Sequence, residues 1–388
     1  MGLILKGADL VTPFQFKKNS SVRIEDNKIV QLIENHSIKH RKEDKIIDLT
    51  GKTVIPGLVD IHIHGIGGYD FNNISPGDMD NFVNILLKHG ITGILMTLFP
   101  QKHKEFIKTI RNTVDLVSKL KKHNIIFGLH LEGPFLNKKM HGALNPDYLW
   151  EPSMEDWYSI YESARGYLKI MTIAPELPGC MDIIRDAATK GVVLSIGHTE
   201  ATYKEVQLAI DNGVTHVTHI YNAMHPTHHR EPGVLGTCYV SDELKIEMIA
   251  DGIHIHPVTI KFLVKLKGDH NIILISDAIS AAGQPDGKYI FADQSVTIKN
   301  GKAYLDNKTI AGSCLTLDVA LKNMIELVET NITSAVRMAS LNPLRVLGKD
   351  SNKGIISVGK DADLVVLNKN NEVEMTILQG EIVYNKNQ

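Results

Sequence analysis

Eight short runs rich in apolar and β-branched residues recur between residues 58 and 278, and amphipathic stretches separate them. Repeated strand and helix units of this kind build a parallel sheet covered by helices. Eight parallel strands are the number that closes a TIM-type (β/α)8 barrel. We therefore predict an α/β fold built on such a barrel. The eight runs are LVDIHIH, GILMTLF, IFGLHLE, KIMTIA, VVLSIGH, THVTHI, IEMIADG and IILISDA.

The two ends of the chain have a different pattern, in which short strands alternate with turn residues. Neither end alone offers enough strands for a stable sheet. We therefore predict one small β-sandwich domain formed by residues 1–54 and 354–388, with a barrel over 55–353. A further β-rich piece, at about 285–312, interrupts the barrel after its last strand. The spacing of apolar residues predicts helices over 77–89, 101–122, 180–190, 200–212, 257–267, 316–329 and 333–340.

Composition narrows the classes of function. The 42 basic and 44 acidic residues give a formal net charge of -2, which does not favour nucleic acid or an anionic membrane as a partner. No run of about 18 apolar residues predicts a membrane-spanning helix. The opening MGLILKGADL has too short an apolar stretch for a signal peptide, and Cys180, Cys238 and Cys314 form no CxxC motif. We expect a cytoplasmic protein with three thiols in its core.

Polar residues lie at the carboxyl ends of the predicted strands, where a barrel builds its active site from several strands at once. His62 and His64 are two residues apart on one strand, so both point to the same side, toward the barrel axis. Any one such residue could be an ordinary loop residue, a rim carboxylate or a helix cap. Together they favour a site for a divalent metal such as zinc or iron. The set is His62, His64, Glu132, His198, His219 and Asp277.

Two further groups of polar residues follow later strands. The segment NAMHPTHHREPG holds three histidines and Arg230, and this cationic cluster suits an anionic substrate group such as phosphate. A solvated polar loop explains the same residues equally well, and the residues alone leave both interpretations open. His254, after the seventh run, could donate a hydrogen bond to a substrate oxygen, whereas His256 precedes Pro257 and is expected outside the site.

Common nucleotide and hydrolase motifs do not occur. The segment GIGGYDF follows the first strand but lacks the GxGxxG spacing, so we predict a flexible turn there. Neither GxxxxGK[ST] nor GxSxG is found, which argues against a P-loop nucleotide site and a serine-hydrolase elbow.

The chain resembles the N-acetylglucosamine-6-phosphate deacetylase family of the amidohydrolase superfamily, nearly from end to end. The resemblance implies a distorted barrel with a β-sandwich made from both chain ends, a homodimer, a sugar phosphate substrate, and one or two divalent metal ions, zinc or iron. HLEGPF and HREPG are much more specific than the HxH pair, which the whole superfamily shares. The matching segments are PGLVDIHIHG, GLHLEGPF, SIGHTEA, THIYNAMHPTHHREPG, ADGIH, LISDAI, AGSCLT and NPLRVLG, with GIISVGKDADLVVLN near the C-terminus.

The same resemblance implies roles for individual residues. Glu132, His198 and His219 match the family's main metal ligands, and Asp277 matches its general base and acid. Asn222 and Ala223 through their backbone, with Arg230, match the group that holds the sugar phosphate, and His254 matches a contact to the sugar near the reacting amide. The expected substrate-binding residues are Ala143, Asn222, Ala223, Arg230, His254, Ile310, Ala311 and Gly312.

This sequence departs from the family pattern at two places. Some members replace the HxH pair by residues that cannot ligate a metal, whereas His62 and His64 are kept, which makes a second metal plausible. Many members have a substrate-contacting histidine after EGPF where this chain has Leu144, and His141 is three residues away.

The implied reaction is metal-dependent hydrolysis of the acetamide of N-acetylglucosamine 6-phosphate, with Asp277 moving the proton. One alternative is a deacetylase of the isomeric galactosamine substrate, N-acetylgalactosamine 6-phosphate. Another is a metal-binding relic of the fold without catalysis, against which Asp277 argues. Cyclic-amide hydrolases of the superfamily commonly have a modified lysine where Glu132 stands, which argues against that class.

Overall fold

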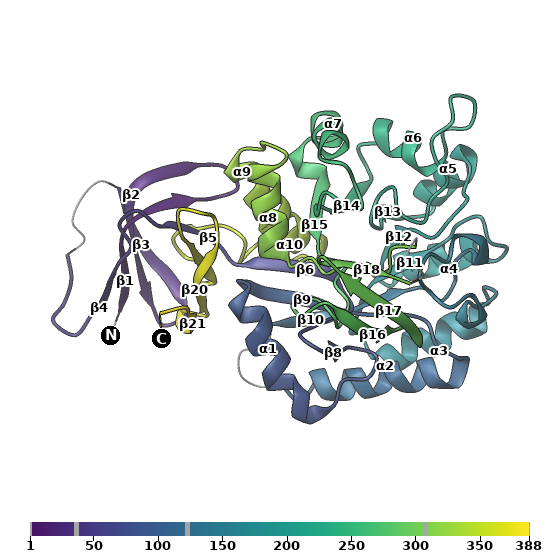
Figure 1. Cartoon of the computed structure of the whole chain (residues 1–388), viewed down its shortest axis with the longest axis horizontal. Coiled ribbons are helices and arrows are strands. Elements are labelled where there is room, and N and C mark those ends of the chain that lie inside the picture. The colour runs from purple at the N-terminus through teal and green to yellow at the C-terminus, as the bar shows by residue number, and fades with distance from the viewer. Residues whose placement is uncertain (1, 35–38, 121–124, 306–308, 388) are drawn as a thin grey trace. The chain divides into compact units, whose positions relative to one another are not determined.

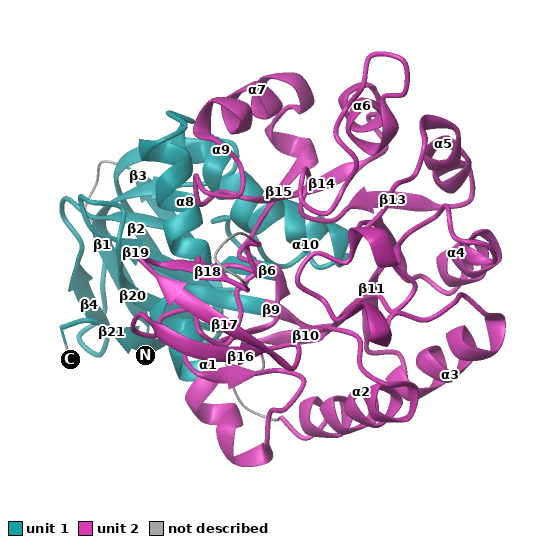
Figure 2. Ribbon diagram, turned by 45° about the vertical axis from the view of Figure 1, so that its right-hand side comes forward, with its two compact units in different colours: residues 1–60, 83–93, 317–388 teal, residues 61–82, 94–316 magenta. Residues whose placement is uncertain are grey.

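The computed structural model describes residues 2–34, 39–120, 125–305 and 309–387. The chain forms two compact units (Figure 2). One contains residues 61–82 and 94–316, and the other contains 1–60, 83–93 and 317–388. The second unit thus includes both terminal segments together with one internal piece of chain, residues 83–93.

One eight-stranded sheet has the strand order β15-β14-β13-β12-β11-β10-β9-β6 (Figure 1). Neighbouring strands from β9 to β15 pair in parallel. Each strand coincides with one of the eight runs identified in the sequence, so the predicted α/β barrel is confirmed. The strands are β6 (Leu58–Ile63), β9 (Ile91–Leu98), β10 (Ile126–Glu132), β11 (Leu168–Ile173), β12 (Val193–Ile196), β13 (Val214–Val217), β14 (Lys245–Ile249) and β15 (Ile272–Ile275).

Backbone hydrogen bonds join the first and last barrel strands just beyond their carboxyl ends. The N–H of Asp277 donates to the carbonyl of His62 at 2.9 Å, and the N–H of His64 donates to the carbonyl of Ala278 at 2.8 Å. The barrel therefore closes at the level where the predicted site residues lie.

Helices occupy all seven of the predicted ranges, and three helices were not predicted. Of these, α3 carries Trp157, Ile160 and Ala164 on one buried face, a spacing that the sequence does contain. The α6 sequence GVLGTCYV has two glycines and β-branched residues, so its intrinsic propensity for helix is poor. The helices are α1 (Met79–Lys88), α2 (His103–Val117), α3 (Met154–Ala164), α4 (Cys180–Thr189), α5 (Tyr203–Asp211), α6 (Gly233–Val240), α7 (Pro257–Lys267), α8 (Leu317–Glu326), α9 (Ile332–Val336) and α10 (Asn342–Val346), with a π-helical turn at Arg337–Leu341.

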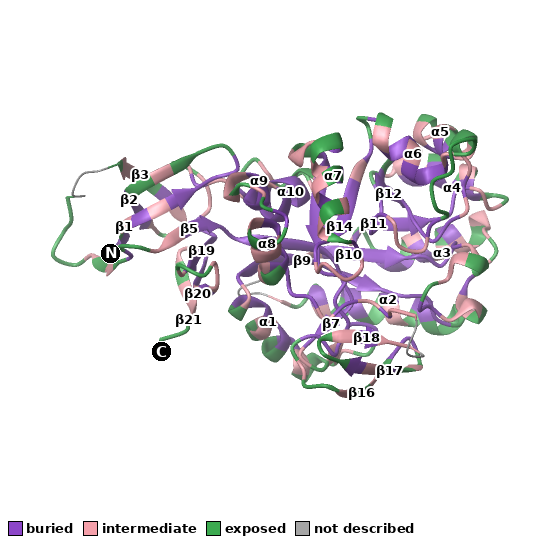
Figure 3. Cartoon of the chain, turned by 45° about the horizontal axis from the view of Figure 1, so that its top comes forward, coloured by how far each residue is buried: buried purple, intermediate pink, exposed green. Residues whose placement is uncertain are grey.

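Local signals position these helices. Thr202 and Glu205 form a reciprocal capping box that starts α5, and the ring of His256 accepts a hydrogen bond from the N–H of Val258 at the start of α7. His256 is therefore a helix cap, as its place before Pro257 indicated. In Figure 3 the barrel strands are buried and the outward faces of the helices are exposed.

The terminal segments form the second sheet, in the order β21-β20-β19-β5-β1-β2-β3, with β4 paired to β1. Apolar side chains such as Leu5, Val22 and Ile377 form its core. The separate β domain expected from both chain ends is therefore present; its exact boundaries stay a prediction. The strands are β1 (Leu3–Val11), β2 (Phe16–Glu25), β3 (Lys28–Glu34), β4 (Lys45–Asp48), β5 (Thr53–Pro56), β19 (Leu364–Leu367), β20 (Val373–Leu378) and β21 (Glu381–Asn385).

The β-rich insertion after β15 is an antiparallel sheet of β16 (Gly287–Phe291), β17 (Gln294–Lys299) and β18 (Lys302–Tyr304). Its apolar face packs in one cluster with Ala143 and Leu144, and the side chain of Gln294 donates to the carbonyl of Ala143 at 2.7 Å. The insertion thereby supports the loop that follows β10.

The segment GIGGYDF forms a tight hairpin of β7 (Gly65–Ile66) and β8 (Tyr69–Asp70), with Gly67 and Gly68 at positive φ in its turn. Among the described residues, no helix is both long and apolar enough to cross a membrane.

Candidate active site

A cavity of about 350 Å³ opens at the carboxyl ends of the barrel strands. Most of the residues expected to form the site line it, whereas His62, Arg230 and Ala311 do not. His62 and Ala311 are fully buried, and Arg230 is exposed. The expected residues that line the cavity are His64, Glu132, Ala143, His198, His219, Asn222, Ala223, His254, Asp277, Ile310 and Gly312.

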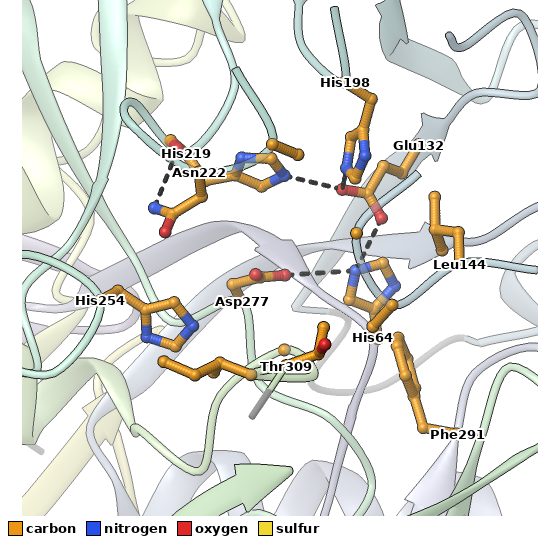
Figure 4. A pocket seen from close by; sticks show the side chains of 15 residues that line it. His64, Glu132, Leu144, His198, His219, Asn222, His254, Asp277, Phe291 and Thr309 are labelled. Atoms are coloured by element: carbon orange, nitrogen blue, oxygen red, sulfur yellow. Dashed lines mark hydrogen bonds and ion pairs between the residues drawn. The ribbon is translucent and has the colours of Figure 1, made fainter. Parts of the chain in front are cut away.

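Glu132, the last residue of β10, is the centre of the cluster (Figure 4). Its Oε1 lies 3.0 Å from His198 Nε2 and 2.9 Å from His219 Nε2. Its other oxygen, Oε2, lies 3.3 Å from His64 Nε2. One carboxylate therefore contacts imidazoles from three different strand ends.

Asp277 follows β15 and faces the HxH pair. Its Oδ1 lies 3.3 Å from Nε2 of His62 and 3.3 Å from Nε2 of His64. Figure 4 shows the carboxylate between His64 and His254 at the edge of the cavity. Asp277 is therefore beside the candidate ligands and also accessible to a molecule in the cavity.

Second hydrogen bonds orient the imidazoles. Nδ1 of His198 lies 2.8 Å from the carbonyl oxygen of Met140, an acceptor, so this nitrogen carries the proton. Its other nitrogen, Nε2, faces Glu132 and lies 3.0 Å from Oε1. Such a partner fixes the tautomer and ring orientation of a metal-binding histidine.

The backbone at the strand ends is bent into the left-handed region. Three residues of the candidate metal site have positive φ, with +49° at His198, +25° at His219 and +50° at Asp277. Non-glycine residues rarely adopt such angles, and their strain is found mainly at functional sites. At Gly312, with φ +54°, an added Cβ would lie 2.5 Å from the side chain of Ile279, so this lining position needs glycine.

Burial and contacts with neighbouring groups shift the pKa values of the cluster in opposite directions. Burial alone would lower the pKa of His64, but hydrogen bonds to Asp277 and Glu132 outweigh it and raise that pKa to about 10. The pKa of His219 rises to about 9, because its hydrogen bond to Glu132 outweighs burial. At His62 burial dominates and lowers the pKa to about 4. Burial opposes ionisation of Glu132, yet the charge and hydrogen bond of His198 hold its pKa well below the usual range.

This donor set fits a divalent metal. Two buried trios bring ligand atoms within 4.8 Å of one another around the cavity, Glu132 with His198 and His219, and Glu132 with His62 and His64. Imidazole nitrogen and carboxylate oxygen are the donors that zinc and iron accept. Cation binding would displace the protons that the imidazoles otherwise hold.

A family model described as "Amidohydrolase family" matches residues 53–383. The chain belongs to the amidohydrolase family. It is 35% identical to an N-acetylglucosamine-6-phosphate deacetylase of Bacillus subtilis over 385 residues, which cover 98% of this chain and 97% of that protein.

The same relationship extends to solved structures. A mutant N-acetyl-D-glucosamine-6-phosphate deacetylase of Mycobacterium smegmatis in complex with N-acetyl-D-glucosamine-6-phosphate matches with a TM-score of 0.92 and 29% identity, covering 98% of this chain and 99% of that one. An N-acetylgalactosamine-6-phosphate deacetylase of Escherichia coli O157:H7 is 28% identical, with 98% of both chains covered. Amidohydrolases that resemble this chain over its whole length therefore include proteins named for two epimeric sugars.

The loop after β13 differs from what the sequence of this amidohydrolase predicted. Residues 225–231 are all exposed, and Nη1 of Arg230 lies 2.9 Å from Nε2 of His229 instead of facing the cavity. Glu231 holds the end of the loop by accepting from the N–H of Tyr203 at 2.8 Å. Within this single chain, Arg230 does not line the cavity.

Leu144 lines the cavity and is only 3% exposed. It belongs to an apolar cluster with Phe291, from the β-rich insertion. His141 does not take the place of the family histidine, because its Nδ1 lies 2.8 Å from the carbonyl of Leu144 and its ring does not line the cavity. The wall at this point is therefore apolar.

Several polar residues inside the barrel were missed by the sequence analysis. Nε2 of His130 lies 2.9 Å from Thr172 Oγ1, which in turn lies 2.9 Å from Thr218 Oγ1. Glu247, in the middle of β14, is fully buried behind His62. Two signals in the sequence could have identified them. His130 is two residues before Glu132, so the strand period places both side chains on the same face. Glu247 is the one charged residue inside the apolar run IEMI.

Proposed function

We propose that this amidohydrolase removes the acetyl group of N-acetylglucosamine 6-phosphate, giving glucosamine 6-phosphate and acetate. The observation that carries the proposal is the position of Asp277, whose carboxylate lies 3.3 Å from His64 Nε2 and lines the same cavity as Glu132, His198 and His219. Similarity over the whole chain to N-acetylglucosamine-6-phosphate deacetylases supports the choice of substrate.

An amide has a poor amine leaving group, so its hydrolysis near neutral pH needs an activated water and a proton donor. A bound divalent metal lowers the pKa of its water from 15.7 toward about 7. Burial raises the pKa of Asp277, but its contacts with His62 and His64 outweigh burial and lower it, so the carboxylate is ionised and able to accept a proton. Asp277 then delivers that proton to the departing sugar nitrogen.

The proposed metal ligands are Glu132, His198 and His219, with His62 and His64 available for a second ion. Zinc and iron are the proposed metals, with one or two ions per chain. All five side chains are at least 95% buried, which shields the donors from competing water.

Among the proposed sugar contacts, His254 lies on the side of Asp277 away from His64 (Figure 4). Nδ1 of His254 lies 2.7 Å from Asp251 Oδ2, which orients the ring for a bond to a substrate oxygen near the amide. Removing one such stabilising donor typically lowers the rate by about a hundred- to a thousandfold. Asn222 and Ala223, with Ala143, Ile310, Ala311 and Gly312, complete the proposed substrate-binding set.

We propose that Arg230 binds the phosphate, although it lies outside the cavity of the single chain. Its role requires either a shift of the exposed loop or a contribution from a second copy of the chain, and a homodimer and a cytoplasmic location are both part of this proposal. A chain that is monomeric in solution and whose activity is unaffected by loss of Arg230 would refute this assignment.

The second candidate is the galactosamine epimer, N-acetylgalactosamine 6-phosphate. Leu144 supports this candidate, because an apolar side chain lines the cavity where many members of the family have a substrate-contacting histidine.

The test is to incubate purified, metal-analysed protein with N-acetylglucosamine 6-phosphate, with its galactosamine epimer, and with unphosphorylated N-acetylglucosamine. Released acetate is then quantified. We expect fast release from the first substrate, slower release from the second and little from the third. Equal or faster release from the epimer would transfer the proposal to that sugar, and no release from any of them with metal bound would refute deacetylation of amino-sugar phosphates.

A further inference from the structure

Glu247 is a buried carboxylate that the proposed reaction does not use. It lies in the middle of β14, and its side chain is fully buried. Its Oε2 lies 2.8 Å from Nδ1 of His62 and 3.4 Å from the backbone N–H of His219. One oxygen therefore contacts two different strand ends of the site without reaching the cavity.

The contact determines which nitrogen of His62 carries the proton. Oε2 already accepts from the N–H of His219, which identifies this oxygen as an acceptor. When this carboxylate is ionised it can only accept, so Nδ1 of His62 is then the donor. Its other nitrogen, Nε2, faces Asp277 Oδ1 at 3.3 Å and Glu132 Oε1 at 3.6 Å, on the side of the proposed metal site.

His130 restricts the same ring from another side. Its centroid lies 4.5 Å from that of His62 in an edge-to-face arrangement. Both nitrogens of His130 have partners, since Nδ1 lies 3.0 Å from the carbonyl of Ile61 and Nε2 lies 2.9 Å from Thr172 Oγ1. His130 therefore acts as a fixed wall, and Glu247 is the group that selects the orientation and tautomer of His62.

We propose that Glu247 is a positioning residue that holds His62 with Nδ1 protonated and Nε2 directed at Glu132 and Asp277, and so makes His62 competent to bind a metal ion. This inference rests on the metal site of the proposed function, and it adds a residue outside the cavity to the groups that build that site. Carboxylates that orient a ligating histidine in this way typically contribute about 10- to 100-fold to metal affinity.

Metal binding to the metal-free protein tests the proposal without any sugar substrate. Affinity for Zn²⁺ would be measured by competition with a chelator for the wild type, Glu247→Gln, His62→Ala and the double variant. We expect Glu247→Gln to weaken the affected site about 10- to 100-fold, because the amide can donate to Nδ1 and allow the wrong tautomer. In the His62→Ala background the same change should have no further effect.

The matched control is Ser195→Ala, which removes a buried hydroxyl on β12 whose partner, at 2.6 Å, is Thr218 Oγ1. It should leave Zn²⁺ affinity unchanged. Affinity of folded Glu247→Gln within about twofold of wild type would overturn the proposal, as would losses from Glu247→Gln and His62→Ala that simply add.

A second measurement needs no variant of Glu247, which matters because a substitution at this buried position can prevent folding. Nitrogen-15 spectra of histidine-labelled, metal-free protein distinguish the two neutral tautomers, and His62→Ala assigns the signal. We expect the Nδ1-protonated form for His62, and the Nε2-protonated form would refute the positioning role. Both readouts are independent of deacetylation, so failure of the proposed activity with the predicted tautomer would separate the two ideas.

Discussion

The strand ends and the loop after β13 both contain several histidines, but the two regions differ in what holds each side chain. At the strand ends His64, His198 and His219 are buried, and each contacts Glu132 at between 2.9 and 3.3 Å. In the loop, residues 225–231 are exposed, and the ring of His228 contacts its loop neighbours: its centroid lies 4.3 Å from that of His229, and its Nδ1 accepts from the N–H of Arg230 at 3.3 Å. The proposed chemistry therefore lies on the sheet, whereas the proposed phosphate contact lies on a segment held at its ends.

The difference has a physical basis in how each region is positioned. Parallel pairing fixes the level of every strand end, so residues distant in sequence are brought together whatever the substrate. The conformation of an exposed loop depends on what it contacts, and its side chains are rarely positioned before binding. Substitutions in the two regions should consequently affect different kinetic constants.

The sharpest test of the strand-end region is Asp277→Asn. The asparagine keeps the shape of the side chain but cannot accept the proton of water, so kcat should fall by about 10²- to 10⁴-fold while metal content stays at the wild-type level. Acetate release and metal analysis of the same sample measure both. A near-normal rate would remove Asp277 from the mechanism.

Replacing His198 by alanine removes a donor rather than the proton acceptor. We expect tightly held metal and activity to be lost together, with metal affinity lowered by more than the roughly 10- to 100-fold that an orienting group alone contributes. Full metal occupancy after dialysis against chelator would contradict the ligand role. His256→Ala, which removes a helix cap outside the cavity, is the control and should retain its metal.

In the loop, Arg230→Ala should raise KM for the phosphorylated sugar about 10- to 100-fold, because a hydrogen bond between charged groups contributes about 1.5–3 kcal/mol. Hydrolysis of unphosphorylated N-acetylglucosamine should not change. Lys138→Ala, which removes an exposed cation that pairs with Glu151, controls for general charge effects. An equal loss on both sugars would show that the loop contributes to chemistry and would remove the contrast between the regions.

The smallest expected effect is at Leu144, in the wall of the cavity. Leu144→His introduces a donor into an apolar wall and should change the ratio of kcat/KM for the two epimers by about 2- to 10-fold, the value of one neutral hydrogen bond. Leu144→Met keeps the volume and serves as the matched control. No change in the ratio would place epimer choice elsewhere.

The sequence was sufficient to predict the barrel and the expected ligands, because strand period and apolar runs are local properties that pairing then converts into proximity. His62, Glu132 and Asp277 were found in this way. Glu247 and His130 were missed because polar residues inside apolar strands look like isolated exceptions until their partners on other strands are known. The placement of Arg230 could not be predicted either, since nothing in HHREPG specifies the direction in which an exposed loop points.

The hydrogen bonds from Asp277 to His62 and from His64 to Ala278 have a consequence for synthesis of the protein. They join the opening strand of the barrel to its final one, so the proton acceptor cannot meet its neighbours until nearly the whole barrel has left the ribosome. Contacts between residues so distant in sequence form slowly. A nascent chain that ends before β15 should therefore hold most of the donor residues and yet be unable to catalyse, and activity should appear only when the last strand docks.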